Sequence, residues 1–189
     1  MGRFMNHKKW VVALALIATA LILTHLPVSE ADAAASASDF QIEGSTLTKY
    51  RGSDERVTIP DTVEVVGESA FENNQKVQLV VVPKSVKRMD AYVFWGCDNL
   101  EEVVLGKGLT SVDEYAFSGC TGLKQITIPE NVQSIDAQAF AGCTNLTDIY
   151  IPDTVTSIAD DAFLNCDNVT IHADEGSVAE KFAQKLAEQ

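Results

Sequence analysis

The four cysteines are the side chains of this sequence best suited to chemistry, and they recur at a fixed spacing. They stand 23 residues apart, with a polar residue in the place of a fifth member, in the column Asn74, Cys97, Cys120, Cys143 and Cys166. Zinc sites use paired Cys-x-x-Cys or histidine ligands, and this spacing supplies neither. A disulfide needs two Cβ vectors that converge, whereas equivalent residues of stacked strands point the same way. The pattern therefore predicts buried, free thiols.

Few other side chains are suited to catalysis. After Ala33 the sequence has one histidine, His172, so a Ser–His or Cys–His mechanism would have to use it. The acid pairs Glu101-Glu102 and Asp160-Asp161 occupy adjacent positions, which point apart on a strand, and we interpret them as solvated. Phosphate-binding and dinucleotide-binding motifs are absent from the sequence. We expect no enzyme, no small-molecule substrate, no metal site and no cofactor.

The charge of the chain excludes one class of partner. After Ala33 the 189-residue sequence has 25 acidic and 11 basic residues, spread along its length. Such a surface repels phosphate backbones and anionic lipids. We expect a solvated acidic surface, no nucleic-acid partner, and membrane contact only through an uncleaved leader.

Residues 1–33 read as a secretory signal peptide. A basic start, residues 1–9, precedes an apolar run over residues 10–26, and Ala-x-Ala sites follow, so cleavage is expected after Ala33 or Ala37. The alternative is an uncleaved anchor, for which 17 apolar residues are short against the roughly 30 Å of hydrocarbon. We expect a protein that is secreted or held in the outer cell envelope.

Two further columns share the 23-residue period of the cysteines. A phenylalanine precedes each member by three residues, and an aliphatic residue follows each by three, at Phe71, Phe94, Phe117, Phe140 and Phe163, and at Val77, Leu100, Leu123, Leu146 and Val169. A fixed period of this length marks a stacked solenoid, in which neighbouring repeats close the core for one another. The sequence predicts a β-rich solenoid of five 23-residue repeats with a ladder of buried Phe rings.

The residue pattern within one repeat predicts a strand, a corner, a second extended piece and a turn. In residues 123–129 the apolar residues alternate before a proline, which indicates a strand with Ile126 and Ile128 inward and a corner at Pro129. A second short extended piece follows, and then Asp136 is placed to cap a single helical turn. The turns end in the column Asn73, Gly96, Gly119, Gly142 and Asn165, whose residue types accept a left-handed backbone.

The ends of a solenoid need caps. We expect a linker at residues 34–39, a hairpin cap at 40–53, the five repeats at 54–168 and a C-terminal cap at 169–189. In the last cap Ser177 and Glu180 form a capping box for a helix whose face includes Val178, Ala179, Phe182, Ala183 and Leu186.

The repeat unit running from Leu123 to Cys143 closely resembles the BspA-type (Treponema pallidum-type) leucine-rich repeats of bacterial surface and secreted proteins. The resemblance covers nearly all of the chain after the leader. It implies a right-handed leucine-rich-repeat solenoid with a parallel sheet on one face, and an association with adhesion to host or neighbouring-cell proteins.

The candidate binding surface consists of apolar residues at outward strand positions. Val81 and Val104 are predicted to be direct neighbours, and Thr58 and Thr127 occupy the same position in other repeats. An exposed apolar strip with a polar rim is typical of a recognition surface, although β-branched residues also simply favour strands. The strip and its rim comprise Leu79, Val81, Val104 and Tyr150, with Arg56, Glu102, Gln125 and Asp148 beside them.

Two functions stay open at this point. The first is an adhesion-like protein-interaction module whose partner is an extracellular or cell-surface protein. The second is a structural or spacer protein of the cell envelope without a dedicated ligand. A second candidate surface, formed by Tyr92, Trp95 and Tyr115, lies around the expected helical turns.

Overall fold

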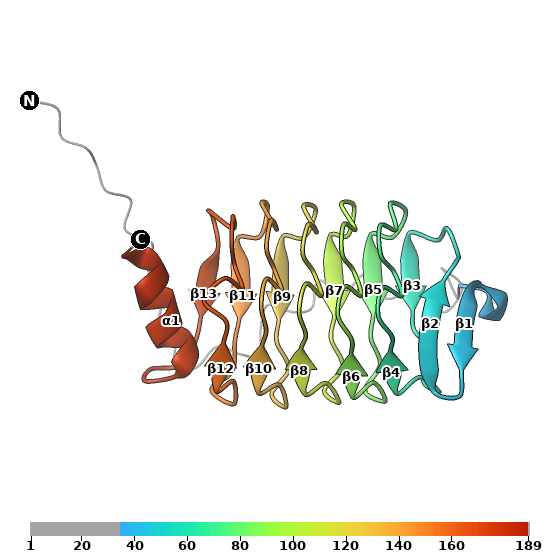
Figure 1. Ribbon diagram of the computed structural model, residues 1–189, viewed down its shortest axis with the longest axis horizontal. Coiled ribbons are helices and arrows are strands. Elements are labelled where there is room, and N and C mark those ends of the chain that lie inside the picture. The colour runs from blue at the N-terminus through green and yellow to red at the C-terminus, as the bar shows by residue number, and fades with distance from the viewer. Residues whose placement is uncertain (1–34, 189) are drawn as a thin grey trace, which may run out of the picture.

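The computed structural model of the protein describes residues 35–188 (Figure 1). The predicted signal peptide, residues 1–33, lies outside the described residues, and its cleavage stays a prediction. Within residues 35–188, no helix is both long and apolar enough to cross a membrane.

The chain winds into a solenoid with two rows of short strands (Figure 1). The upper row in the figure, which we call ladder A, contains β3 (Arg56–Thr58), β5 (Leu79–Val81), β7 (Glu102–Val104), β9 (Gln125–Thr127), β11 (Asp148–Tyr150) and β13 (Thr170–His172). The lower row, ladder B, contains β2 (Thr46–Tyr50), β4 (Val65–Val66), β6 (Arg88–Met89), β8 (Ser111–Val112), β10 (Ser134–Ile135) and β12 (Ser157–Ile158).

Parallel pairing in register holds both ladders together, with one rung added by each turn of the chain. The sequence predicts a parallel sheet on one face, and the second extended piece of each repeat supplies another. Pairing is interrupted once in each row, between β7 and β9 and between β6 and β8, so each ladder consists of two sheets.

The first rung comes from the N-terminal hairpin. Strand β1 (Phe40–Glu43) pairs antiparallel with β2, which then pairs in parallel with β4 and joins ladder B. The solenoid therefore has six turns rather than five, because the cap strand supplies a rung that lacks the Phe and Cys columns. Residues Ala37–Asp39, in the expected linker, form a short 3-10 helix capped by the side chain of Ser36.

The expected single helical turn is not a helix. The amide of Trp95 closes a turn on the carbonyl of Tyr92, but the amide of Phe94 donates to the carbonyl of Ala116 in the next rung, 2.8 Å away. A helix keeps its amides bonded within its own segment, so this alternation produces a series of turns that are hydrogen-bonded between rungs. The five predicted left-handed positions are confirmed, with φ between 54° and 75° in the column Asn73, Gly96, Gly119, Gly142 and Asn165.

Asp113 and Asp90, which occupy the position of Asp136 in other repeats, accept hydrogen bonds from side chains of ladder B. The Oγ of Ser111 donates to Oδ1 of Asp113 at 2.6 Å, and Nε of Arg88 donates to Oδ1 of Asp90 at 2.6 Å. Each partner lies two residues earlier, in ladder B. These carboxylates therefore tie the strand of ladder B to the turn that follows it.

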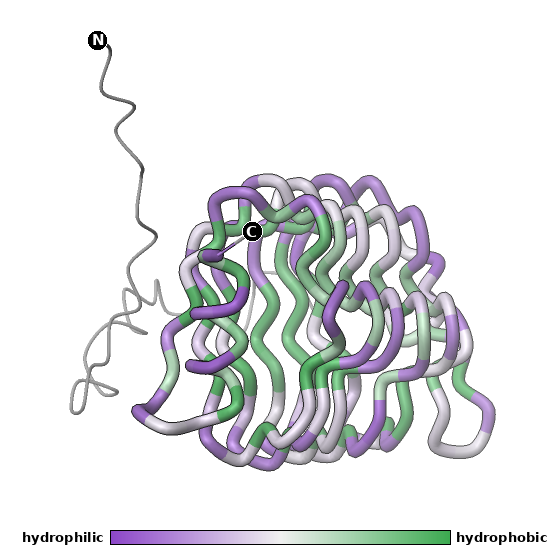
Figure 2. Tube along the Cα trace, turned by 60° about the vertical axis from the view of Figure 1, so that its left-hand side comes forward, coloured by the Kyte–Doolittle hydropathy of each residue, from purple (hydrophilic) through white to green (hydrophobic). Residues whose placement is uncertain are grey.

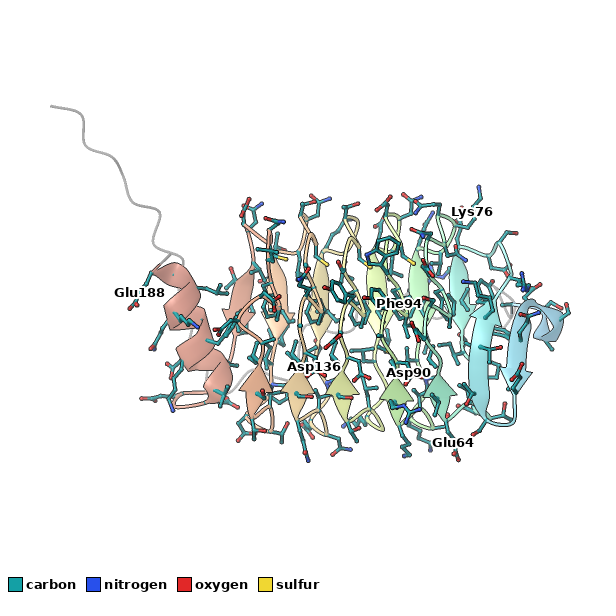
Figure 3. All side chains as sticks on the ribbon, viewed as in Figure 1. Glu64, Lys76, Asp90, Phe94, Asp136 and Glu188 are labelled. Carbon is teal, nitrogen blue, oxygen red and sulfur yellow. The ribbon has the colours of Figure 1, made fainter. Side chains whose placement is uncertain are left out.

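The core is a stack of aromatic rings that runs from one cap to the other. Figure 3 places Phe94 in the interior, between the two ladders. Tyr50 and Phe40 extend the five predicted phenylalanines at the N-terminal end, and Phe182 of α1 extends them at the other. Neighbouring ring centroids lie 5.0–5.8 Å apart along the stack Phe40, Tyr50, Phe71, Phe94, Phe117, Phe140, Phe163 and Phe182.

The cysteine column is part of this core. All four residues are buried free thiols, as the register predicts. Each Sγ donates to the carbonyl of a Phe 26 residues earlier, at 2.9–3.2 Å, so the thiols fasten adjacent turns to one another. Burial raises the pKa of Cys97 to about 12 and raises the pKa of Cys120 well above its usual range. The Cys97 and Cys120 thiols are therefore protonated at physiological pH, whereas a hydrogen bond with Cys143 lowers the pKa of Cys166.

Helix α1 (Val178–Ala187) closes the C-terminal end. The Oγ of Ser177 accepts from the amide of Glu180 at 3.1 Å, and Oε2 of Glu180 accepts from Gly176 at 2.7 Å, which confirms the predicted helix start. Ala179, Phe182 and Ala183 are buried against the last turn, whereas Val178 is exposed and does not belong to the packed face. Figure 2 shows α1 against the strands of the last turn, with hydrophobic residues along the strand segments and hydrophilic residues gathered on the turns.

Candidate functional site

The outward face of ladder A presents two rows of side chains, because the first and third residues of each strand point away from the core. The middle residue of every strand is buried. The first row is Arg56, Leu79, Glu102, Gln125, Asp148 and Thr170, and the second row is Thr58, Val81, Val104, Thr127, Tyr150 and His172.

Three of the predicted strip residues form one patch. Val81 pairs directly with Val104 across β5 and β7, as the sequence predicts, and Leu79 pairs with Glu102. Val104 is 44% exposed, whereas Leu79 and Val81 are half-buried. We call Leu79, Val81 and Val104 the valine patch.

Tyr150 is not continuous with the valine patch. Thr127 and the interruption between β7 and β9 separate the two. A shallow hollow lies at this junction, and its lining residues are Glu101, Glu102, Lys124, Gln125 and Thr147. The Nζ of Lys124 lies 2.6 Å from Oε2 of Glu101, which closes one side of the hollow with an exposed ion pair. The expected strip is therefore two patches with a charged junction between them.

The second patch contains His172, which lies beside Tyr150 in the last rung of ladder A. His172 stacks on Tyr150 with ring centroids 4.4 Å apart and planes at 11°. Its Nε2 lies 2.8 Å from Oδ1 of Asp148, and this hydrogen bond lowers the pKa of Asp148. The sequence feature that could have predicted this contact is the position of His172, 22 residues after Tyr150. The last turn is one residue shorter than the 23-residue period, but parallel pairing still aligns His172 with Tyr150. Tyr150, 45% exposed, is thus held on one side by His172 and lies next to Thr127 on the other.

The turns between the two ladders carry the second candidate surface. Tyr92 and Tyr115 stack in parallel, with centroids 4.8 Å apart and planes at 5°, and Trp95 stands at 84° to Tyr92 with centroids 6.5 Å apart. Trp95 is 39% exposed, and both tyrosines are half-buried. The sequence prediction that these three residues gather on the turns is confirmed.

Both tyrosines have a left-handed backbone, with φ of 60° at Tyr92 and 56° at Tyr115. A bulky residue in this conformation costs about 1–2 kcal/mol relative to one that accepts it freely. Ser69 and Gln138 occupy the equivalent positions of neighbouring turns with similar φ. The repeat therefore requires the conformation but not the aromatic rings.

The described residues hold no cluster of three or more His, Cys, Asp or Glu side chains arranged to bind a metal ion. The buried thiols donate to carbonyl groups, and Asp148 is hydrogen-bonded both to His172 and to Oγ1 of Thr147, which donates to its Oδ2 at 2.8 Å.

Comparison with known proteins agrees with this architecture. A sequence model described as the BspA type leucine rich repeat region matches residues 45–170 in six copies, which is one more than the five repeats read from the sequence. Among curated proteins, none matches the chain in sequence.

Solved structures of bacterial leucine-rich repeat proteins share the fold. A leucine-rich cell surface protein from Faecalibacterium prausnitzii is 33% identical over 73% of this chain, with a TM-score of 0.68. The Treponema pallidum leucine-rich repeat protein is 28% identical over 71% of this chain, with a TM-score of 0.69, and a Bacteroides ovatus leucine-rich repeat protein is 29% identical over 69%, with a TM-score of 0.60. The chain covers 37%, 68% and 36% of these three proteins, respectively.

Proposed function

The chain belongs to the family of BspA-type leucine-rich repeat proteins, and on this premise we propose that it is a non-enzymatic, adhesion-like module that binds an extracellular or cell-surface protein. The binding surface is the outward face of ladder A, centred on the valine patch, with Glu102 beside it. Asp148 and Tyr150 form its second part across the charged junction. The protein acts outside the cell or in the outer cell envelope.

The observation that carries the proposal is the choice of residue at one outward position. The third residue of the strand is Thr58 in β3 and Thr127 in β9, which fit the fold without exposing an apolar side chain. The chain instead places Val81 and Val104 side by side, and 44% of Val104 remains exposed. Because the fold does not require apolar residues here, we assign them to a partner that covers them.

The surroundings of the patch support a protein partner. The ladder holds the side chains on rigid strands, and Glu102 and the Lys124–Glu101 pair provide a polar rim. An apolar centre with a charged rim is the usual anatomy of a protein interface. The similar Faecalibacterium prausnitzii protein is described as a cell surface protein, which supports the proposed location.

The test replaces Val81 and Val104 with threonine. Threonine keeps the β-branch, so we expect the free energy of unfolding to stay within about 1 kcal/mol. A hydroxyl left without a hydrogen bond under a partner costs about 1–3 kcal/mol, which weakens affinity roughly tenfold or more. Saturable retention on immobilised host-cell or bacterial-wall proteins measures the affinity, with Thr58→Ser on the same face as the matched control.

Equal retention of the wild type and the Val81→Thr, Val104→Thr double variant would remove the valine patch as the binding surface. A large loss of stability in the double variant, measured by thermal melts, would show instead that these side chains belong to the core. Weaker retention of the Thr58→Ser control to the same degree would show that the effect is not specific to the patch.

A structural or spacer role is the second candidate. The observation that favours it is the aromatic stack, which runs from Phe40 to Phe182 and is closed at one end by the hairpin and at the other by α1. A solenoid capped at both ends is a rigid rod of fixed length. This role predicts no saturable binding by any of the faces.

A further inference from the structure

The rings of Tyr92 and Trp95 form a corner of two nearly perpendicular aromatic faces on the turn margin of the solenoid. We call these two residues, with Tyr115 behind Tyr92, the aromatic corner. Tyr115 covers one face of Tyr92 and fixes its orientation, with centroids 4.8 Å apart. The Trp95 ring is 39% exposed, which leaves its surface available to a ligand. The corner is therefore preorganised by contacts within the chain.

The fold does not account for these rings. Ser69 and Gln138 adopt the same backbone conformation as the two tyrosines, and the position equivalent to Trp95 is occupied by Ser118 in the next turn. Placing large aromatic residues at left-handed positions strains the backbone, and such strain is retained where surrounding structure or function requires it. The exposed Trp95 is not needed to fill the core, because Phe94 fills it.

Carboxylates surround the aromatic corner. The backbone carbonyl of Glu114 accepts from the amide of Tyr92 at 3.1 Å, so the two residues are neighbours on adjacent turns. Glu72 occupies the position of Trp95 in the preceding turn, and its Oε1 accepts from Nδ2 of Asn73 at 3.4 Å. Glu68 precedes Ser69 in the same preceding turn and is exposed, as is Glu114. Within the described residues, none of these three glutamates takes part in an ion pair. The nearby Lys49 is engaged, because its Nζ donates to the carbonyl of Ser69 at 2.9 Å.

We propose that the aromatic corner binds a cationic side chain, an Arg guanidinium or a Lys ammonium, from a basic segment of a protein partner. The face of an aromatic ring carries negative charge density and attracts a cation, most strongly when the ring is Trp. The exposed Trp95 supplies such a face, and Tyr92 stands beside it with its plane at 84° to the indole. The exposed carboxylates of Glu68 and Glu114 supply charge-assisted hydrogen bonds, and the formal net charge of −13 steers a basic segment toward the molecule.

Charge and ring geometry favour a cation over a neutral sugar. A sugar stacks on an open, flat ring face, but one face of Tyr92 is already covered by Tyr115. Unpaired carboxylates next to the rings add attraction for a cation and add little for a neutral ring. The aromatic corner lies on the turn margin, away from the outward face of ladder A, so this site is separate from the valine patch.

The test uses the full chain and two matched peptides, Gly-Arg-Gly-Arg-Gly-Arg-Gly and the same peptide with citrulline in place of arginine. Citrulline has the shape of arginine without its charge. Isothermal titration should show binding of the arginine peptide that weakens as salt increases, and much weaker binding of the citrulline peptide. Trp95→Leu, which keeps an apolar side chain and removes the indole face, should weaken binding of the arginine peptide about 5–30-fold.

Control variants separate this site from the rest of the surface. Leu164→Ala removes the other exposed apolar residue of the Trp95 column, two turns beyond Ser118, and should leave peptide affinity unchanged. The Val81→Thr, Val104→Thr double variant should also bind the peptide as the wild type does, so failure here is distinguishable from failure of the proposed function. Glu114→Gln should weaken binding and reduce its salt dependence, and thermal melts of each variant confirm that it is folded.

Three outcomes would overturn the proposal. One is equal affinity for the arginine and citrulline peptides, and another is full affinity in the Trp95→Leu variant. The third is no binding of the arginine peptide at millimolar concentration together with Trp95-dependent binding of a neutral oligosaccharide such as chitotriose, which would assign the corner to a glycan.

Discussion

Each turn of the chain contributes one phenylalanine to a stack in which neighbouring rings support one another. Phe117 lies at its middle, fully buried, with parallel neighbours at 5.3 and 5.2 Å. Phe117→Ala removes a ring that has protein on both faces, so we expect it to lower the free energy of unfolding by about 3–5 kcal/mol. Denaturant midpoints measure the change, and a shift equivalent to less than about 0.5 kcal/mol would contradict the buried stack.

The buried thiols make the protein sensitive to alkali. Burial raises the pKa of Cys97 from its usual range to about 12, so the folded state keeps a proton that the unfolded state loses first. Below about pH 9 the protonated Cys97 thiol makes its full contribution to the free energy of unfolding, and this contribution decreases as the pH rises from about 9 toward 12. We expect the free energy of unfolding to decrease over this range.

Alkylation and a Cys97→Ala variant distinguish the titration of the buried thiols from that of other groups that lose protons at alkaline pH. Alkylation of the native protein at pH 8 should be slow and should become complete in denaturant, because the thiolate is the reactive species. A Cys97→Ala variant that loses stability above pH 9 as steeply as the wild type would show that this thiol is not responsible.

At the scale of the element, the corner after β7 requires a residue without a side chain, Gly106. Other turns have proline at this corner, whereas Gly106 occupies it after β7. A Cβ at Gly106 would collide with the carbonyl group of Pro83 in the preceding turn, so the two backbones touch where only glycine fits. Gly108 packs in the same way against the carbonyl of Lys84.

Gly106→Ala should therefore lower the free energy of unfolding by about 1–3 kcal/mol, the usual range for an inserted atom in packed structure. Gly44→Ala is the control for space, because no atom lies within 4 Å of its added Cβ, and its positive φ of 63° limits the expected cost to about 1–2 kcal/mol from strain alone. Chemical denaturation compares the two. A Gly106→Ala variant as stable as the wild type would mean that the turns separate easily at this junction.

At the scale of the molecule, the stability of each turn depends on the turns next to it, because each turn contacts only its neighbours. Helix α1 covers the last one: Phe182 packs on Phe163 at 5.8 Å, and Nζ of Lys185 lies 2.6 Å from Oδ1 of Asp160. Phe182→Ala should expose the C-terminal end and let β13 and β12 open before the middle of the solenoid.

Hydrogen exchange of backbone amides measures this order. In the Phe182→Ala variant we expect faster exchange in residues 148–172 and little change in residues 56–104. Lys185→Ala, which removes only an exposed ion pair, should lower the free energy of unfolding by less than about 1 kcal/mol. Uniform acceleration along the whole chain would show that the solenoid unfolds as one cooperative unit.

The repeat, the inward columns and the left-handed turns could all be predicted from the sequence, because these features depend on residue type at a fixed period. Asn73 and Gly96 accept the same backbone, the alternation around Ile126 has the period of a strand, and Ser177 with Glu180 marks the helix start. The neighbours Val81 and Val104 followed from register alone, since a parallel ladder with a constant period aligns equivalent residues.

The features that depend on contacts between turns, or on the two ends of the solenoid, are seen only in the three-dimensional structure. The sixth rung lacks the Phe and Cys columns, and β2 becomes a rung because it pairs with β4. The turns are not helical because the amide of Phe94 bonds the next rung, and the strip divides because β7 and β9 are unpaired. The ring geometry of the His172–Tyr150 stack and the right angle between Tyr92 and Trp95 depend on side-chain packing in three dimensions, whereas spacing along the chain indicates only which residues are in register.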